Sequence, residues 1–94
     1  MLLGDVIARF DDEAFAGETL FALDDLALTA RVAALAAENN VSAGEFVRES
    51  VGRFANGASD EQWLTLIGQM SRAQDPGQVF LRRVLSAALI AQGA

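Results

Sequence analysis

Three helix starts built from the same side-chain chemistry place the strongest constraint on how this sequence can fold. Each is a residue that can accept a hydrogen bond from a helix N-terminus, followed three residues later by glutamate or glutamine: Ser42 with Glu45, Ser59 with Gln62, and Asp75 with Gln78. In such a capping box, each of the two side chains bonds to a backbone N–H that the helix leaves free. Pro76 strengthens the third signal, because proline suits the first position of a helix. We therefore expect a helix to begin at each of these three places.

Apolar residues recur at helical spacing between these signals. Four of them follow one another at i, i+4, i+7 and i+8 and predict a helix from about residue 25 to residue 39: Leu28, Val32, Leu35 and Ala36. A shorter helix is expected to end near Asp11, and the helix after Ser42 is expected to end near Gly57, since glycine readily takes the left-handed capping conformation. The helix after Ser59 has one apolar face, which we expect in the core: Trp63, Leu66, Ile67 and Met70.

Residues 14–24 leave two structures open. The run Leu20-Phe21-Ala22-Leu23 is apolar at four consecutive positions, which fits either a buried helical turn or a short strand. The other segments are helical, so the sequence predicts an all-α fold, a compact bundle of four to five short helices that could intertwine as a dimer. Single domains usually have roughly 100–150 residues, so residues 1–94 are expected to form one domain.

The expected helix after Pro76 has an unusually wide apolar face. With successive residues about 100° apart, its apolar side chains cover an arc of roughly 200°, whereas a surface helix needs a stripe of only ~100°. The helix is therefore either central in a monomer or packed against a second subunit. For the second alternative, the candidate interface residues are Leu81, Arg82, Leu85 and Leu89. A charge at Leu85 or Leu89 is then expected to dissociate the dimer without unfolding it.

Composition excludes several classes of function. The chain has seven basic residues, all arginine, and thirteen acidic ones, which give a formal charge of -6, and it has no histidine, cysteine, lysine or tyrosine. Disulfides, zinc–cysteine clusters, thiol nucleophiles, Schiff bases and imidazole acid–base catalysis are therefore excluded. The negative charge also disfavours binding to nucleic acid or to anionic membranes. We expect a protein that is not an enzyme and that needs no cofactor or metal.

The acidic cluster Asp11-Asp12-Glu13 is the one sequence feature that suggests a cation. Three consecutive carboxylates point in different directions on a helix or a strand, and their spacing matches no calcium loop. We interpret the cluster as a solvated helix terminus and Asp24-Asp25 as a helix cap. No convincing signal peptide or membrane span is found, so the expected location is the cytoplasm.

The stretch of residues 32–51 resembles the two helices of ribbon-helix-helix proteins, which are dimeric transcription regulators and antitoxins. The residues that carry the resemblance are Val41, Ser42, Glu45, Phe46, Val47, Arg48 and Glu49. The resemblance covers residues 25–54 and implies a helix hairpin and an intertwined dimer. The DNA-reading strand of the family would fall on residues 18–24, which contain no arginine, lysine, asparagine or glutamine to contact a base edge.

We therefore expect a small acidic protein–protein interaction module, an adaptor or regulatory subunit. Its partners would be a second copy of itself and an unidentified protein, because a chain this small has a limited core and no disulfide or metal to support it. The alternative is a ribbon-helix-helix-like regulator or antitoxin. The structure of residues 18–24 distinguishes the two, since the alternative requires a strand there.

Overall fold

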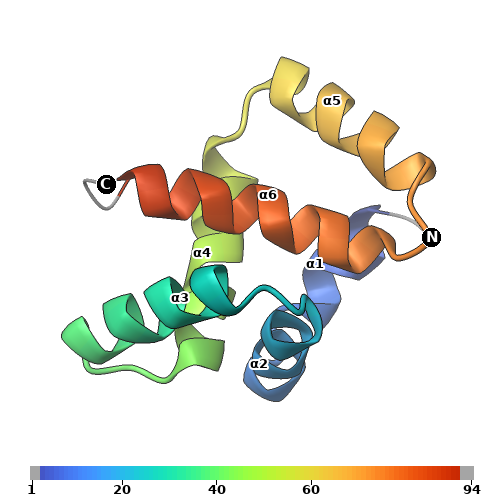
Figure 1. The fold of residues 1–94 in the computed structure, drawn as a ribbon. Helices are drawn as coiled ribbons and strands as arrows, with labels where there is room; N and C mark the ends of the chain where they lie inside the picture. The colour runs from blue at the N-terminus through green and yellow to red at the C-terminus, as the bar shows by residue number, and fades with distance from the viewer. Residues whose placement is uncertain (1–2, 92–94) are drawn as a thin grey trace.

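The computed structural model describes residues 3–91, and all regular structure within them is helical. The helices, shown in Figure 1, are α1 (Leu3–Arg9), α2 (Glu13–Ala22), α3 (Leu26–Glu38), α4 (Ala43–Gly57), α5 (Asp60–Ser71) and α6 (Pro76–Ala91). The all-α prediction is confirmed, but the expected number of four to five helices was too low for the described residues. Within the same residues, no helix combines the length and the apolar character needed to cross a membrane.

The additional helix is α2, in the segment that the sequence left open between helix and strand. The Asp12 carboxylate begins it by accepting hydrogen bonds from the N–H groups of Ala14 and Phe15, at 2.9 and 3.3 Å. Asp12 therefore separates α1 from α2, which makes the acidic cluster the start of a helix as well as the end of one. Leu20 and Leu23 are buried in the core, while Phe21 between them is exposed.

All three helix starts predicted from capping signals are confirmed, although only one forms the complete box. Ser59 and Gln62 each bond to the other's backbone N–H. Ser42 accepts the N–H of Glu45, but the Glu45 carboxylate accepts from Arg48 instead of closing the box. At α6 the residues are Asp75 and Gln78: the aspartate accepts the glutamine N–H at 3.2 Å, while the glutamine side chain donates to the carbonyl of Ala22. Tertiary partners thus compete with the local cap.

Helix α3 has the predicted limits. The Asp25 carboxylate caps its start by accepting the N–H of Leu28 at 3.0 Å. At its end, the N–H of Val41 bonds to the carbonyl of Ala36 and the N–H of Asn40 bonds to the carbonyl of Ala37, the pair of bonds that defines a Schellman motif. Asn40 supplies the left-handed residue that this motif requires, with φ at 59°.

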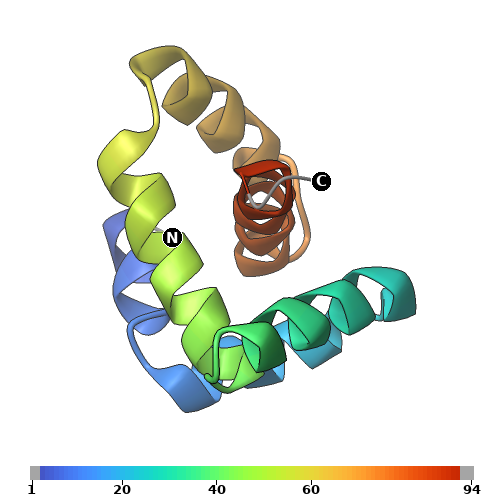
Figure 2. The ribbon, with the colours of Figure 1, turned by 90° about the vertical axis from the view of Figure 1, so that its left-hand side faces the viewer.

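Helix α6 lies at the centre of the molecule. Figure 2 shows it end-on, with α4 along one side, α5 above and α3 below. It packs against α2, α4 and α5, and α4 in turn packs against α2 and α3. The radius of gyration is 12.4 Å, which matches the roughly 12 Å expected for a compact domain of this length. The wide apolar arc of α6 is therefore covered within one chain.

Five aromatic rings form a row through the core, and each ring comes from a different part of the chain. The row runs from α2 to α5 in the order Phe15, Phe10, Phe80, Phe54 and Trp63, with neighbouring ring centroids 5.1 to 6.2 Å apart. These separations are typical of favourable edge-on and tilted aromatic pairs. The row connects α2, the turn after α1, α4 and α5 to α6, and Phe80 of α6 lies at its middle.

The apolar face predicted for α5 is correct at three of its four positions. Leu66 and Met70 are buried, and Trp63 is partly buried at the end of the aromatic row. Ile67 was expected in the core but is 46% exposed. Helix α5 packs only against α6 among the stronger helix pairs, so its contact face is too narrow to cover Ile67.

Candidate functional site

The interface residues predicted on α6 lie inside the chain, with one exception. Leu81 and Leu85 are fully buried and Leu89 is 6% exposed. The neighbouring helices of the same chain cover these three leucines, so in this fold they form no exposed face for a partner. A charge at Leu85 would now meet the core of the same chain. Arg82 is the exception, since it is exposed.

Arg82 connects α6 to the turn between α2 and α3. Its guanidinium donates to the Asp25 carboxylate at 3.1 Å and to the carbonyl of Leu23 at 2.9 Å. The Asp25 carboxylate also accepts the N–H of Leu28, which caps α3. The Leu28 hydrogen bond and then Arg82 hold the pKa of the Asp25 carboxyl below its usual value. Arg82 therefore positions a helix start and is not a free group for binding a partner.

The lowered pKa of Asp25 sets the direction of a pH dependence. A carboxyl group whose pKa is lower in the folded chain than in the unfolded chain stabilises the folded chain at pH values above the unfolded pKa, which is about 3.9. This stabilisation is lost as the pH falls through the folded pKa. We expect Arg82→Gln to raise the folded pKa of Asp25 part of the way, because the Leu28 hydrogen bond remains. The Asp25 carboxyl carbon can be titrated by NMR, with Arg83→Gln as the control. Equal pKa values for Asp25 in both variants would contradict this role of Arg82.

The negative charge is concentrated in the first quarter of the sequence. Residues 1–25 contain seven carboxylates and one arginine, a formal charge of -6, whereas residues 26–94 contain six carboxylates and six arginines, a charge of zero. The whole net charge of the chain therefore belongs to the segment of α1, α2 and their turns. This asymmetry is visible in the sequence alone.

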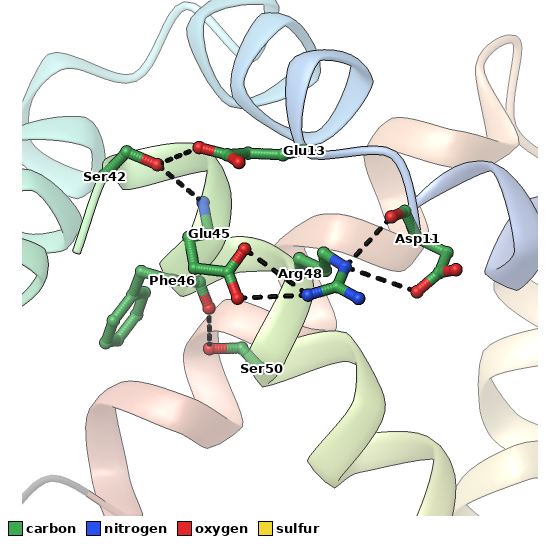
Figure 3. A network of polar contacts seen from close by, with 7 residues as sticks. All are labelled: Asp11, Glu13, Ser42, Glu45, Phe46, Arg48 and Ser50. Carbon is green, nitrogen blue, oxygen red and sulfur yellow. Dashed lines mark hydrogen bonds and ion pairs between the residues drawn. The ribbon is translucent and has the colours of Figure 1, made fainter.

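A network of polar contacts fixes this acidic segment to α4 (Figure 3). Arg48 of α4 donates through Nε to the carbonyl of Asp11 at 3.0 Å and pairs through Nη1 with Glu45, also at 3.0 Å. The Glu45 and then the Asp11 carboxylates raise the pKa of Arg48 above its usual value. Ser42 donates its hydroxyl to Glu13 at the start of α2. The turn between α1 and α2 is thus held to α4 at Asp11 and at the start of α2.

Helices α1, α2 and the first turn of α6 enclose a cleft of about 270 Å³, which we call the α1–α2–α6 cleft. Its lining residues are Val6, Arg9, Phe10, Phe15, Glu18, Thr19, Ala22, Asp75, Gly77 and Gln78. Val6 and Phe10 are buried and Phe15 is partly buried, so the cleft has an apolar floor that includes two rings of the aromatic row. The volume lies just below the roughly 300–1,000 Å³ of pockets for drug-sized ligands, which suits individual side chains of a partner.

Charged side chains surround this apolar floor. Glu18 of α2 and Asp75 at the start of α6 are exposed carboxylates, and neither forms an ion pair with another residue of the described range 3–91. Arg9 is the one cation among the lining residues, and its guanidinium carbon lies 4.4 Å from the centroid of the Phe15 ring. The Thr19 hydroxyl donates to the carbonyl of Phe15. The cleft thus joins apolar surface to negative charge.

The α1–α2–α6 cleft has few nucleophilic or acid–base groups among its lining residues. Its only hydroxyl is that of Thr19, and the sequence contains no histidine or lysine to activate it. Elsewhere, the buried hydroxyl of Ser50 donates to the carbonyl of Phe46 in its own helix. Among residues 3–91, no group of three or more acidic side chains is placed to hold a metal ion.

The segment that the ribbon-helix-helix resemblance assigns to DNA reading is helical up to its fifth residue. Residues 18–22 belong to α2, and residues 23–24 form the turn before α3. The two helices of the resemblance are present as α3 and α4, joined by the turn at Asn40. No strand lies ahead of α3 in the described residues.

The residues of the cleft could not be grouped from the sequence. Residues 75–78 lie more than 50 positions after residues 6–22, which supply the rest of the lining, and Phe15 and Glu18 belong to the segment whose structure was open. The one sequence signal for the site is the excess of carboxylates in residues 1–25. Comparisons of this chain with models of protein families, with curated proteins and with solved structures found no match.

Proposed function

We propose that this chain is a small, non-catalytic protein–protein interaction module that binds a basic, apolar segment of another protein in the α1–α2–α6 cleft. The observation that carries the proposal is the coincidence of two features in one place. The cleft has an apolar floor, and two of the three elements that form it belong to the segment of residues 1–25, which carries the entire net charge of the chain. An apolar floor supplies affinity through burial, while the surrounding charge favours one kind of partner and repels others.

A basic amphipathic helix fits this site better than other partners. Its apolar face would cover Phe15 and Ala22, above the buried Val6, and its lysine or arginine residues would lie near Glu18 and Asp75. Recognition of this kind depends on apolar anchors spaced at i, i+3, i+4 and i+7 that lie in a groove. Acidic ligands, including nucleic acid, would be repelled by the same carboxylates.

The homodimer expected from the sequence is retained only as a proposal, and it needs another surface. The leucines of α6 are covered, whereas Leu26 at the start of α3 and Ile90 near the end of α6 are 84% and 74% exposed. Ile90 also lines a groove between α3 and α6. This surface lies on α3 and the C-terminal end of α6, whereas the α1–α2–α6 cleft uses only the first turn of α6, so the two interactions would not exclude each other.

The proposal is tested with a synthetic amphipathic peptide of leucine and lysine in which leucines recur at helical spacing. We expect Ala22→Arg, at the rim of the cleft, to weaken binding at least tenfold, a loss of about 1.4 kcal/mol. Ala33→Arg, on the exposed face of α3, is the matched control, because it changes the net charge equally. We expect Ala33→Arg to change the dissociation constant of the peptide by less than about twofold, because salt screens a charge that lies far from the cleft. Isothermal titration calorimetry measures both constants.

Three outcomes would contradict the proposed function. Equal weakening by Ala22→Arg and Ala33→Arg would mean that the peptide responds only to net charge. Failure of the leucine–lysine peptide to bind, or equal binding of a peptide with glutamate in place of lysine, would show that the cleft does not select a basic segment.

A further inference from the structure

The aromatic wall of the α1–α2–α6 cleft already holds a guanidinium group. The guanidinium carbon of Arg9 lies 4.4 Å from the centroid of the Phe15 ring, within the approximately 6 Å that defines a cation–π contact. Guanidinium is planar and more weakly hydrated than an ammonium group, which is why arginine stacks on aromatic rings more readily than lysine does. The Phe15 ring, which is partly buried, can therefore hold a guanidinium group on one face.

Arg9 contacts the Phe15 ring, but a guanidinium group in the cleft could also bind the two carboxylates that line it. Glu18 lies one helical turn from Phe15 on α2, and residues three apart on a helix are neighbours on its surface. Asp75 lines the same cleft from α6. Within residues 3–91, Arg9 forms an ion pair with neither carboxylate. Carboxylates bind guanidinium in two-pronged hydrogen bonds, so a second guanidinium could gain contacts that Arg9 lacks.

We propose that the Phe15 face, with Glu18 and Asp75, is a subsite for an arginine side chain of the partner, and that Arg9 occupies it in the free protein. This inference rests on the proposed function and makes it specific. The partner segment carries an arginine next to its apolar anchors, and that arginine displaces Arg9 from the ring. The side chain of Arg9 is exposed, so it can move into solvent without disturbing the core.

The subsite predicts a preference for arginine over lysine. Two amphipathic peptides are compared that differ only in having arginine or lysine at every basic position. A surface cation–π contact corresponds to about two- to fivefold in affinity, and we expect the arginine peptide to bind more tightly by that factor. Phe15→Leu keeps an apolar side chain but removes the ring, so we expect it to abolish the preference while the lysine peptide still binds.

Removal of Arg9 tests its role as an internal occupant. We expect Arg9→Gln to tighten binding of the arginine peptide by a further two- to fivefold. The matched control is Arg31→Gln on α3, an exposed arginine with no ion pair among the described residues, which makes the same change in net charge. A general charge effect would strengthen binding of both peptides to both variants. Displacement instead strengthens mainly the arginine peptide, and only in the Arg9 variant.

The possible results separate this inference from the proposed function. Equal binding of the two peptides to the native protein and to Phe15→Leu would overturn the arginine subsite and leave the proposed function standing. Equal gains for Arg9→Gln and Arg31→Gln would overturn the role of Arg9. If neither peptide binds the native protein, both proposals are wrong. Far-ultraviolet circular dichroism shows whether each variant is folded before it is titrated. If Phe15→Leu does not fold, Arg9→Gln provides the test.

Discussion

Leu85→Asp should unfold the chain, whereas Ile90→Asp on the same helix should leave it folded. Leu85 is fully buried in the central helix α6, and Ile90 is 74% exposed. A buried carboxylate without a partner costs several kcal/mol. The loss of the leucine contacts in the core costs about 2–5 kcal/mol more. Single domains have a total stability of only about 5–15 kcal/mol, so the first substitution removes most or all of it.

Circular dichroism with urea denaturation measures this difference, and light scattering on the same samples reports the mass. We expect Leu85→Asp to have lost its helical signal even without denaturant. We expect the free energy of unfolding of Ile90→Asp to lie within about 0.5 kcal/mol of that of the native chain. A Leu85→Asp chain that keeps its helices while its mass falls by half would contradict the central position of α6. That result would restore a dimer interface on this helix.

Gly44→Ala should be strongly destabilising, although alanine is normally the better helix residue. A Cβ atom at Gly44 would lie 2.5 Å from the carbonyl oxygen of Glu13 and 3.0 Å from its Cγ. The obstacle is the backbone of α2, so the two helices would have to separate. Gly17 of α2 faces Gly44 across the same contact between α2 and α4, since a Cβ atom at Gly17 would lie 3.6 Å from the Cα of Gly44. Forcing extra volume into such a contact typically costs about 1–3 kcal/mol.

Gly52 of the same helix provides the matched control. A Cβ there would meet no atom within 4 Å, so Gly52→Ala should stabilise the chain by about 0.4–1 kcal/mol by restricting the unfolded state. We therefore expect the urea midpoints of the two variants to move in opposite directions. A shift in the same direction, or equal midpoints, would show that α2 and α4 do not approach closely at Gly44.

The helix starts could be predicted because their signals are local. Ser42, Ser59 and Asp75 each bond to an N–H three residues away, so the sequence contains both partners of the interaction. The side chains of Glu45 and Gln78 do not complete their boxes, because Arg48 and the carbonyl of Ala22 compete for them. For Gln78 the competing group lies 56 positions away, and no spacing rule connects the two.

The packing partners of each helix could not be predicted in the same way. The apolar arc of α6 indicated burial on two sides, but it did not indicate whether the cover comes from the same chain or a second one. Helix α2 was left open because Leu20-Phe21-Ala22-Leu23 is uniformly apolar, while its helical start depends on the single cap Asp12. Gly44 has no local signal for its role, since the atoms that it approaches belong to another helix.

The most direct test of the proposed binding site is an isotope-filtered NOE spectrum of the labelled protein with the unlabelled leucine–arginine peptide. The spectrum detects only pairs of protons that lie close together across the interface. We predict cross-peaks from the leucine methyl groups of the peptide to the Phe15 ring and to the Val6 methyl groups, which line the α1–α2–α6 cleft. Cross-peaks to the exposed side chains Leu64 and Ile67 of α5, with none to Phe15, would contradict the site.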